Sequence, residues 1–279
     1  MTDEAGGLPL PISGGTRVFA IVGDPIRQVQ STTEFNRLLR RAGFQGVLVP
    51  LHVTPEDLPT AFEGIRRMAN FDGFIITVPH KIAMCDLVDE LLANGARVGA
   101  INAARRGPDG RWQGDNFDGA GCVRALAERG VTLAGRQVLQ IGAGGVGRAI
   151  AMAFAAGGAS RISFYDTDEA REASLAQNLR THFPELVVEP RQSALDGHDL
   201  VVNCTSLGMA EADPYPVDPA GFGADTVVVD VIQTPEVSPM LVAAAEKGCI
   251  TQPGRAMTIA QMALVAEFFG VPVDALSDG

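Results

Sequence analysis

A lysine in a chain that otherwise uses arginine is the first candidate for proton chemistry. Of the 22 basic residues only two are lysines, and one of them, Lys81, ends the segment Thr77-Val78-Pro79-His80-Lys81. The pKa of an arginine is too high for proton exchange near neutral pH, whereas burial or a neighbouring cation lowers the pKa of a lysine. Lys81 is therefore a candidate general acid or base. The alternative is an ordinary surface lysine.

A glycine-rich segment is the second candidate. Gly142-Ala143-Gly144-Gly145-Val146-Gly147 has the G-x-G-x-x-G spacing, between a predicted strand and a predicted helix. In such a turn one glycine permits the tight bend, one lets the backbone approach a pyrophosphate, and one allows close packing of helix on sheet. The following helix presents free N–H groups to the anion. The segment predicts dinucleotide binding by Gly142, Gly144, Gly145, Val146 and Gly147.

An acidic residue after the next predicted strand bears on the choice of cofactor. A carboxylate at Asp166 would accept hydrogen bonds from the ribose 2′-hydroxyl of NAD and repel the 2′-phosphate of NADP. The alternative is that an aspartate here caps the following helix, a use that Asp168 could serve at the same time. The sequence therefore favours NAD over NADP.

The elements that position these residues alternate in type. Short apolar runs alternate with longer helical stretches, which is typical of an α/β protein. The second half predicts a doubly wound, Rossmann-type nucleotide-binding domain. Strands are expected at 18–22, 46–51, 74–78, 138–141, 162–165, near 187, 200–203 and 227–231, and helices at 33–42, 81–92, 119–129, 146–156, 169–182 and 257–269.

Length and composition limit the possible classes. A chain of 279 residues exceeds the usual single domain, which predicts two domains, and 46% hydrophobic residues are enough for well-built cores. The net charge of −11, without a run of basic residues, disfavours binding to nucleic acid or to an anionic membrane. The four cysteines and four histidines lack the spacing of a disulfide or zinc framework. No signal peptide or membrane-spanning run is evident, so we expect a cytoplasmic protein.

Further polar motifs occur in a fixed order around the glycine segment. They are Gly23-Asp24-Pro25-Ile26 with Ser31, the segment ending in Lys81, Gly99-Ala100-Ile101-Asn102, Asn116-Phe117-Asp118-Gly119, Asn203-Cys204-Thr205-Ser206-Leu207-Gly208-Met209, and Gln261. From about residue 18 to residue 270, their order and separation resemble the shikimate/quinate dehydrogenase family.

The resemblance implies a two-domain enzyme. An α/β substrate domain would comprise residues 1–118 and 254–279, with C-terminal helices returning to it, and the nucleotide-binding domain would comprise 119–253. The expected reaction is NAD-linked hydride transfer at a ring hydroxyl of shikimate, quinate or a close analogue, as in aromatic amino acid biosynthesis, by a monomer or homodimer. The roles carried over are catalysis by Lys81 and Asp118, substrate binding by Ser31, Thr77, Asn102 and Gln261, and cofactor binding by Thr205 and Met209 besides the glycine segment and Asp166.

Several positions depart from the family pattern. A second serine is usual two residues before Ser31, where the two hydroxyls hold the substrate carboxylate; here the position is Val29, which donates no hydrogen bond. The other departures are Gln28, Thr32, Ile75, Phe117 and Gln233. They are compatible with an altered ring acid, such as an aminated analogue. Equally, Gln28 or Gln233 could replace the lost donor, so that shikimate still binds.

Two rival functions stay open at this point. One is a nucleotide-sensing relative that has lost turnover, against which the intact Lys81 and Asp118 argue. The other is a dehydrogenase of folate one-carbon units, which would need an aromatic slot for a pterin. With one tryptophan and two tyrosines, the chain shows little sign of such a slot.

Overall fold

The chain forms two compact units in this computed structural model, which describes residues 11–27, 29 and 31–273. The first unit comprises Met1–Phe117 and Met262–Gly279, and the second comprises Asp118–Gln261. Helix α8 (Gly254–Phe268) contains the second boundary, so its first half belongs to the second unit. The expected domain ranges, which gave all of 254–279 to the substrate domain, stay a prediction.

The first unit contains a mixed six-stranded sheet in the order β2-β1-β3-β5-β6-β4. Strand β1 pairs in parallel with β2 and β3, whereas β5 runs antiparallel to β3 and β6. The strands are β1 (Arg17–Gly23), β2 (Gly46–His52), β3 (Phe71–Ile76), β4 (Glu90–Leu91), β5 (Ala103–Arg106) and β6 (Trp112–Asp115). The helices are α1 (Ser31–Arg41), α2 (Leu58–Ile65), α3 (Ala93–Val98) and the 3-10 turn η1 (Ala83–Asp86).

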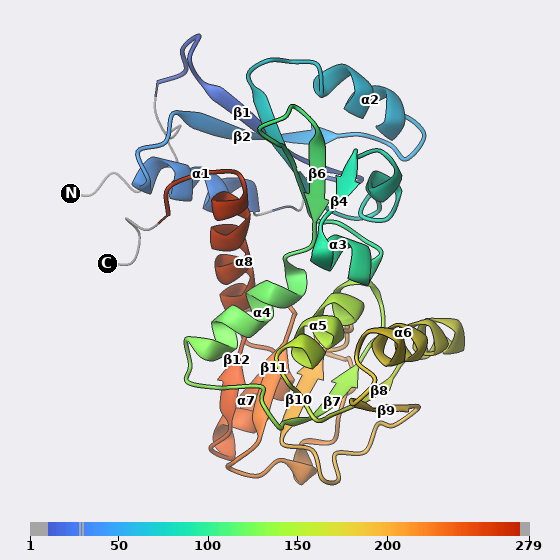
Figure 1. Cartoon of the computed structure of the whole chain (residues 1–279). Coiled ribbons are helices and arrows are strands. Elements are labelled where there is room, and N and C mark those ends of the chain that lie inside the picture. Colours follow the sequence, from blue (N-terminus) through green and yellow to red (C-terminus); the bar gives the residue numbers. More distant parts are fainter. Residues whose placement is uncertain (1–10, 28, 30, 274–279) are drawn as a thin grey trace, which may run out of the picture. The chain divides into compact units, whose positions relative to one another are not determined.

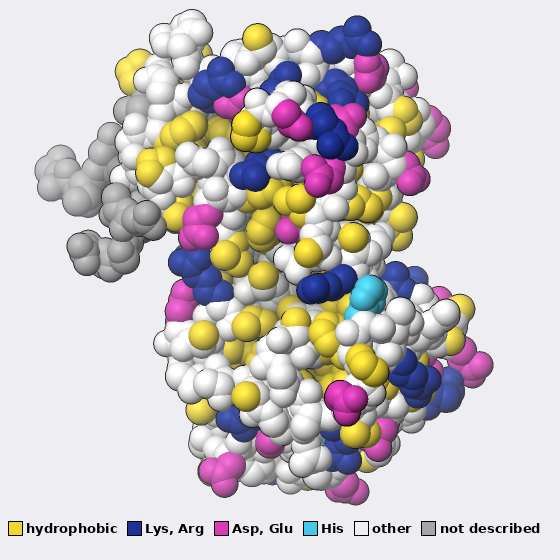
Figure 2. Space-filling model, in the orientation of Figure 1, with side chains coloured by type: hydrophobic (Ala, Val, Ile, Leu, Met, Phe, Trp, Pro, Cys, Tyr) yellow, Lys and Arg dark blue, Asp and Glu magenta, His cyan; other side chains and the backbone are white. Residues whose placement is uncertain are grey.

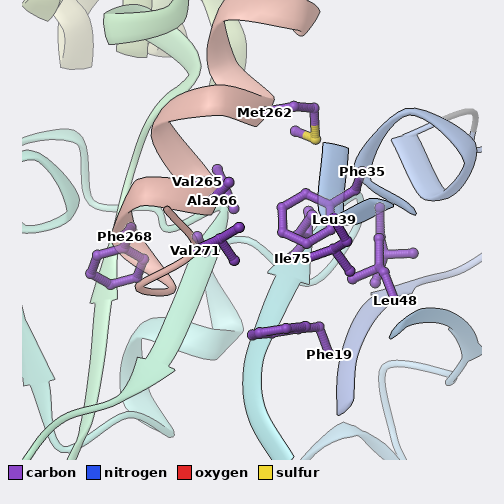
Figure 3. Packing of buried hydrophobic residues seen from close by; sticks show 12 residues of the cluster. Phe19, Phe35, Leu39, Leu48, Ile75, Met262, Val265, Ala266, Phe268 and Val271 are labelled. Carbon is purple, nitrogen blue, oxygen red and sulfur yellow. The ribbon is translucent and has the colours of Figure 1, made fainter. Parts of the chain in front are cut away.

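The end of α8 completes one of the cores of this unit. Phe19 of β1 stacks on Phe269 with ring centroids 5.0 Å apart, and Phe35 of α1 meets the same ring edge-on. Val265 and Ala266 are fully buried in this cluster (Figure 3). The second half of α8 therefore supplies apolar surface against which β1 and α1 are buried. This agrees with the expectation that the helix returns to the first unit.

The second unit contains a parallel sheet in the order β12-β11-β10-β7-β8-β9. This is the doubly wound arrangement, in which the chain starts in the middle at β7, moves out to β9, and returns to β10 on the other side. The expected Rossmann-type domain is confirmed. The strands are β7 (Gln137–Ile141), β8 (Arg161–Tyr165), β9 (Val187–Pro190), β10 (Leu200–Asn203), β11 (Val227–Asp230) and β12 (Ile250–Gln252).

Helices cover both faces of this sheet. Leu139 and Ile141 of β7 pack in a cluster with Met240 and Leu241 of α7, so the intervening residue faces the opposite side, where α5 and α6 lie (Figure 1). The helices are α4 (Asp118–Ala127), α5 (Gly145–Ala156), α6 (Glu169–His182), the 3-10 turn η2 (Pro219–Gly221) and α7 (Pro239–Glu246).

One expected helix is wrong. Residues 81–92 form only η1 and the short strand β4, because the segment is recruited to the sheet. Asp89 donates its backbone N–H to Trp112 O and accepts the Trp112 N–H at its carboxylate, and Leu92 donates to Gly114 O. These bonds to β6 compete with helical ones, and the apolar spacing of the sequence does not reveal them. The strand expected at 74–78 likewise ends two residues earlier, before Thr77.

Charges of both signs are interspersed on the surface of the first unit that Figure 2 shows. Several arginines of the first unit pair with carboxylates, including Arg66 with Asp89 at 2.6 Å and Arg17 with Asp72. Across the described part of the chain, every helix is too short or too polar to cross a bilayer.

Candidate active site

The glycine turn lies where the parallel sheet of the second unit changes winding direction. Gly142 follows β7 with a φ of +100°, and a Cβ there would come within 2.9 Å of the backbone carbonyl of Cys204, which follows β10. A Cβ on Gly147 would collide with the carbonyl oxygen of Gly142. Both glycines are therefore required by packing, and the turn occupies the crevice position in which such sheets bind ligands.

The middle of the turn is open. Gly144 is the N-cap of the twelve-residue helix α5, and a Cβ on Gly144 or Gly145 would meet no atom within 4 Å. These positions need no glycine for internal packing, so their backbone is free for close approach by a ligand. The first turn of α5 offers unpaired N–H groups and the positive end of the helix dipole. The residues present thus fit the pyrophosphate of a dinucleotide.

Asp166 braces this turn from the end of β8. Its Oδ2 accepts the Ala143 N–H at 2.7 Å, and its Oδ1 accepts the Asp168 N–H at 2.9 Å. Its own N–H donates to Glu172 Oε1 at 2.9 Å. Asp168 caps α6 by accepting the N–H groups of Ala170 and Arg171. The capping alternative for Asp168 is confirmed, and both oxygens of Asp166 already hold backbone.

A hydrogen-bonded network orders the loop after β10. Asn203, fully buried, accepts the backbone N–H of Thr205 at 3.0 Å and its hydroxyl at 2.7 Å, and donates to Asp230 Oδ1 at 3.1 Å. Ser238 donates to the other oxygen of Asp230 at 2.6 Å. Burial raises the pKa of the Asp230 carboxyl, although the hydrogen bonds that it accepts lower this pKa in part. The same loop continues to Met209, a residue that is 56% exposed.

Asp118 and Gln261 meet inside the second unit. Asp118 begins α4 and is 4% exposed, and Gln261 of α8 donates its side-chain amide to Asp118 Oδ1 at 2.7 Å. Two glycines let α4 come close to its neighbours. A Cβ on Gly119 would collide with Ala149 O of α5, and one on Gly121 would lie 2.7 Å from the Gln261 Cβ. The close packing of these helices therefore positions a buried carboxylate.

In the first unit, Thr77 and Lys81 lie in a tight turn after β3. Thr77 donates its N–H to Val22 O at 3.0 Å and accepts the His80 N–H at 3.0 Å. The buried His80 ring bonds to Val53 O at 2.8 Å, and Lys81 O accepts the Ile101 N–H at 2.9 Å. The backbone of the turn is thus tied to three other segments, and the Lys81 side chain is half-buried.

Asn102 lies beside this turn at the start of the antiparallel part of the sheet. It is 1% exposed, its carbonyl oxygen accepts the Ile76 N–H at 2.8 Å, and its Oδ1 accepts the Phe117 N–H at 2.9 Å. It therefore links the end of β3 to the segment that leads into Asp118. Lys81 belongs to the first unit and Asp118 to the second, and their catalytic pairing stays a prediction.

Comparison with known proteins agrees with these features. A family model described as the shikimate dehydrogenase substrate binding domain matches residues 21–104. A curated shikimate dehydrogenase (NADP(+)) from Geobacter metallireducens is 34% identical over 260 residues, which cover 90% of both chains. The chain belongs to the shikimate dehydrogenase family. It is an NAD(P)-dependent dehydrogenase of that type.

Two solved structures of the same fold are informative. A shikimate dehydrogenase in complex with NADP+ matches with a TM-score of 0.87 and 28% identity, covering 97% of this chain and 96% of that one. A 5-ketofructose reductase from Gluconobacter sp. strain CHM43 matches with a TM-score of 0.85 and 26% identity, covering 94% of this chain and 98% of that one. Similar folds therefore serve substrates of different chemistry.

The expectation of NAD as the cofactor is wrong by this comparison. The curated relatives of the family are named for NADP(+), and a matching structure holds NADP+. The physical reason lies in Asp166, on which the expectation depended. Because its carboxylate bonds to the glycine turn, an acidic residue here has a structural use that the sequence pattern does not distinguish from ribose binding.

The serine pair that the family resemblance predicts for carboxylate binding is incomplete in this chain. Ser31 is the half-buried first residue of α1, whereas Val29 packs against the apolar cluster around Phe19 and Phe35. The Thr32 hydroxyl oxygen is buried without a partner among the described residues. Gln28, considered as a replacement donor, lies outside the described residues. Gln233, the other candidate, donates to Thr258 Oγ1 at 2.9 Å.

Two residues that support the glycine turn and Asp166 were missed by the sequence reasoning. Glu172 is 2% exposed and holds the Asp166 backbone while pairing with Arg191 at 3.1 Å. Gln140 is fully buried in β7 and bonds to the glycine turn. A signal for Gln140 was present, because a glutamine within the apolar run Val138-Leu139-Gln140-Ile141 needs a polar partner.

Proposed function

We propose that the protein interconverts a ring secondary hydroxyl and its ketone on shikimate, quinate or a close analogue, with NADP(H). Asp118 is the observation that carries this proposal. Its carboxylate is 4% exposed and accepts a hydrogen bond from the Gln261 amide at 2.7 Å. The same unit contains the glycine turn that fits a dinucleotide pyrophosphate. A buried carboxylate held in place by a hydrogen bond is a candidate for acid–base chemistry in such a unit.

Lys81 and Asp118 divide the proton work in this proposal. When bound, the nicotinamide accepts or supplies the hydride, and a proton must leave or join the substrate oxygen. Lys81 transfers that proton as a general acid or base. Asp118 orients the Lys81 side chain and accepts a hydrogen bond from the substrate hydroxyl. Thr77, Asn102, Ser31 and Gln261 position the ring.

The remaining residues of the second unit hold the dinucleotide. The N–H groups at Gly144 and Gly145 bind the pyrophosphate, and the loop of Thr205 and Met209 borders the nicotinamide. The 2′-phosphate needs a basic partner. Arg191 serves this role, because Glu172 anchors its guanidinium at 3.1 Å and also holds the backbone of Asp166.

A second candidate substrate is a polyhydroxy ketone without a carboxylate. Val29 supports it, because an apolar side chain in place of a serine removes a donor to a carboxylate. The fold is also that of a 5-ketofructose reductase, an enzyme named for a ketose. The catalytic pair would be unchanged, since the reacting group is again a carbinol or carbonyl.

A substrate panel tests these alternatives. Initial rates with NADP(H) are measured for shikimate, quinate, an aminated shikimate and 5-ketofructose, each at several concentrations. The highest kcat/KM on shikimate or quinate supports the ring acids, and the highest on the ketose supports the second candidate. If the protein binds NADP(H) by fluorescence titration yet turns over none of the four, the proposed substrates are wrong and a nucleotide-sensing role gains support.

A further inference from the structure

Gln140 is a polar side chain in the middle of an apolar strand. It belongs to β7, which lies between β8 and β10 in the parallel sheet, and it is fully buried. Its neighbours Leu139 and Ile141 are buried apolar residues of the core on the other face. Burying an amide costs free energy unless its groups are hydrogen-bonded, so its bonds must offset that cost.

Those bonds go to the two ends of the glycine turn. Gln140 Nε2 donates to Gly142 O at 2.8 Å and to Gly147 O at 3.0 Å. The approach is close, because a Cβ on Gly147 would lie 3.0 Å from Gln140 Nε2. One amide group therefore joins the residue that leaves the strand to the first turn of α5.

The carbonyl oxygen of the same amide shows that this position is not optimised for stability alone. Gln140 Oε1 is buried with no partner among the described residues. An unsatisfied buried acceptor destabilises the fold, whereas an apolar residue of similar size would avoid that cost. The donors to the turn are what distinguish glutamine from such a residue at this position.

We propose that Gln140 is a positioning residue for the dinucleotide. By holding both ends of the turn, it keeps the backbone at Gly144 and Gly145 in the conformation that receives the pyrophosphate, before the dinucleotide arrives. Preorganisation of this kind lowers the free-energy cost of binding. Gln140 touches no reacting atom, so it acts on affinity and not on the chemical step. The inference rests on the proposed dinucleotide site.

The test compares two buried glutamines of the same unit. Gln140→Met keeps the side-chain length but removes both donors. Gln252→Met is the matched control, because Gln252 of β12 is also fully buried with an unpartnered Oε1, and bonds weakly to Cys122. Losing the two bonds is expected to raise the Kd for NADPH about tenfold in Gln140→Met, with kcat at saturation changed less than about twofold. Gln252→Met is expected to keep the wild-type Kd.

A pH-dependent variant provides an independent readout. In Gln140→Glu the carboxylate would face two carbonyl oxygens, and only its protonated form can donate to one of them. The Kd of this variant is therefore expected to fall towards the wild-type value as the pH is lowered, beyond any change in the wild type. A merely structural role would not produce this recovery.

The outcomes are separable. A Kd for Gln140→Met equal to that of the wild type, or an equal rise in Gln252→Met, would overturn the role of Gln140. A Gln140→Glu protein whose relative affinity does not vary with pH would also count against it. Wild-type protein that fails to bind NADPH in the same titration would instead contradict the proposed dinucleotide site.

Discussion

Gln261 reaches Asp118 across a helix contact that only a glycine permits. The amide–carboxylate bond is 2.7 Å long, and a Cβ on Gly121 would lie 2.7 Å from the Gln261 Cβ and 3.0 Å from its Cα. The position of the carboxylate therefore depends both on a side-chain bond and on the absence of one side chain. These two dependencies are separable by mutation.

Gln261→Leu removes the donor while retaining similar volume. Losing a hydrogen bond to a buried carboxylate costs about 1–3 kcal/mol. If the bond holds Asp118 in its reactive position, that loss appears in the transition state, and kcat/KM is expected to fall by about 10- to 100-fold. Steady-state kinetics with the best ring substrate measure this. Unchanged kcat/KM would show that Gln261 has no part in orienting Asp118 for the reaction.

Gly121→Ala tests the packing. The added methyl must displace Gln261 or its backbone, which is expected to lower the free energy of unfolding by about 1–3 kcal/mol. Gly64→Ala is the control, since its Cβ in α2 would meet no atom within 4 Å. Because alanine favours helices, Gly64→Ala should stabilise the protein by up to about 1 kcal/mol. Urea unfolding of both variants decides; equal effects would contradict the close helix contact.

Lys81→Met separates catalysis from binding. If Lys81 transfers the proton, kcat is expected to fall by about 10²- to 10⁴-fold, while the Kd for NADPH stays near the wild-type value. Arg105→Met, another basic residue of the first unit, is the comparison. A Lys81→Met enzyme with normal kcat and a raised KM for the ring substrate would make Lys81 a binding residue.

Val29→Ser restores the hydroxyl that the family pattern places before Ser31. If a carboxylate binds near Ser31, the new donor is expected to raise kcat/KM on shikimate or quinate by about tenfold or more, because a hydrogen bond to a charged group contributes about 1.5–3 kcal/mol. A neutral ketose should gain nothing from it. The ratio of kcat/KM for the two substrate classes is the measurement, and an unchanged ratio would place the carboxylate elsewhere.

Cys122 predicts a loss of stability at alkaline pH. Burial in α4 raises the pKa of this thiol to about 12, from an ordinary value of 9.0. Below pH 9 both folded and unfolded chains hold the proton, so stability is unaffected. Between about pH 9 and 12 only the unfolded chain ionises, and the free energy of unfolding falls by up to about 1.4 kcal/mol per pH unit. Cys122→Ala should reduce this slope in denaturant titrations.

The local patterns predicted the second unit more fully than the first. A glycine turn between an apolar strand and a helix specifies its neighbours directly, so β7, α5, β8, α6 and β10 could be predicted from local sequence. In the first unit, β5 depends on pairing with β3 and β4 on pairing with β6, and neither pair is adjacent in the sequence. The same difference explains why the helix expected at 81–92 was wrong. Its apolar spacing is a local pattern, whereas the segment actually bonds to Trp112 of β6, which the local pattern does not reveal.

The site was predictable where a residue type has one use and less so where it has several. Gly142 and Gly147 belong to the first kind, because a side chain at either position would collide with the backbone. Asp166 belongs to the second kind, since a carboxylate there can hold a ribose or, as its bonds show, the turn itself. The bond between Gln261 and Asp118 joins residues 143 positions apart, so only the fold reveals it.

The position of α8 affects the order in which the chain folds during synthesis. The cluster around Phe19 includes Val265, Ala266 and Val271, so the strands of the first unit lack part of their core until these later residues have been made. The second unit lies entirely between these two segments. On the ribosome, the nucleotide-binding unit can therefore complete its own sheet first. Until α8 emerges, the strands of the first unit keep part of their apolar surface exposed.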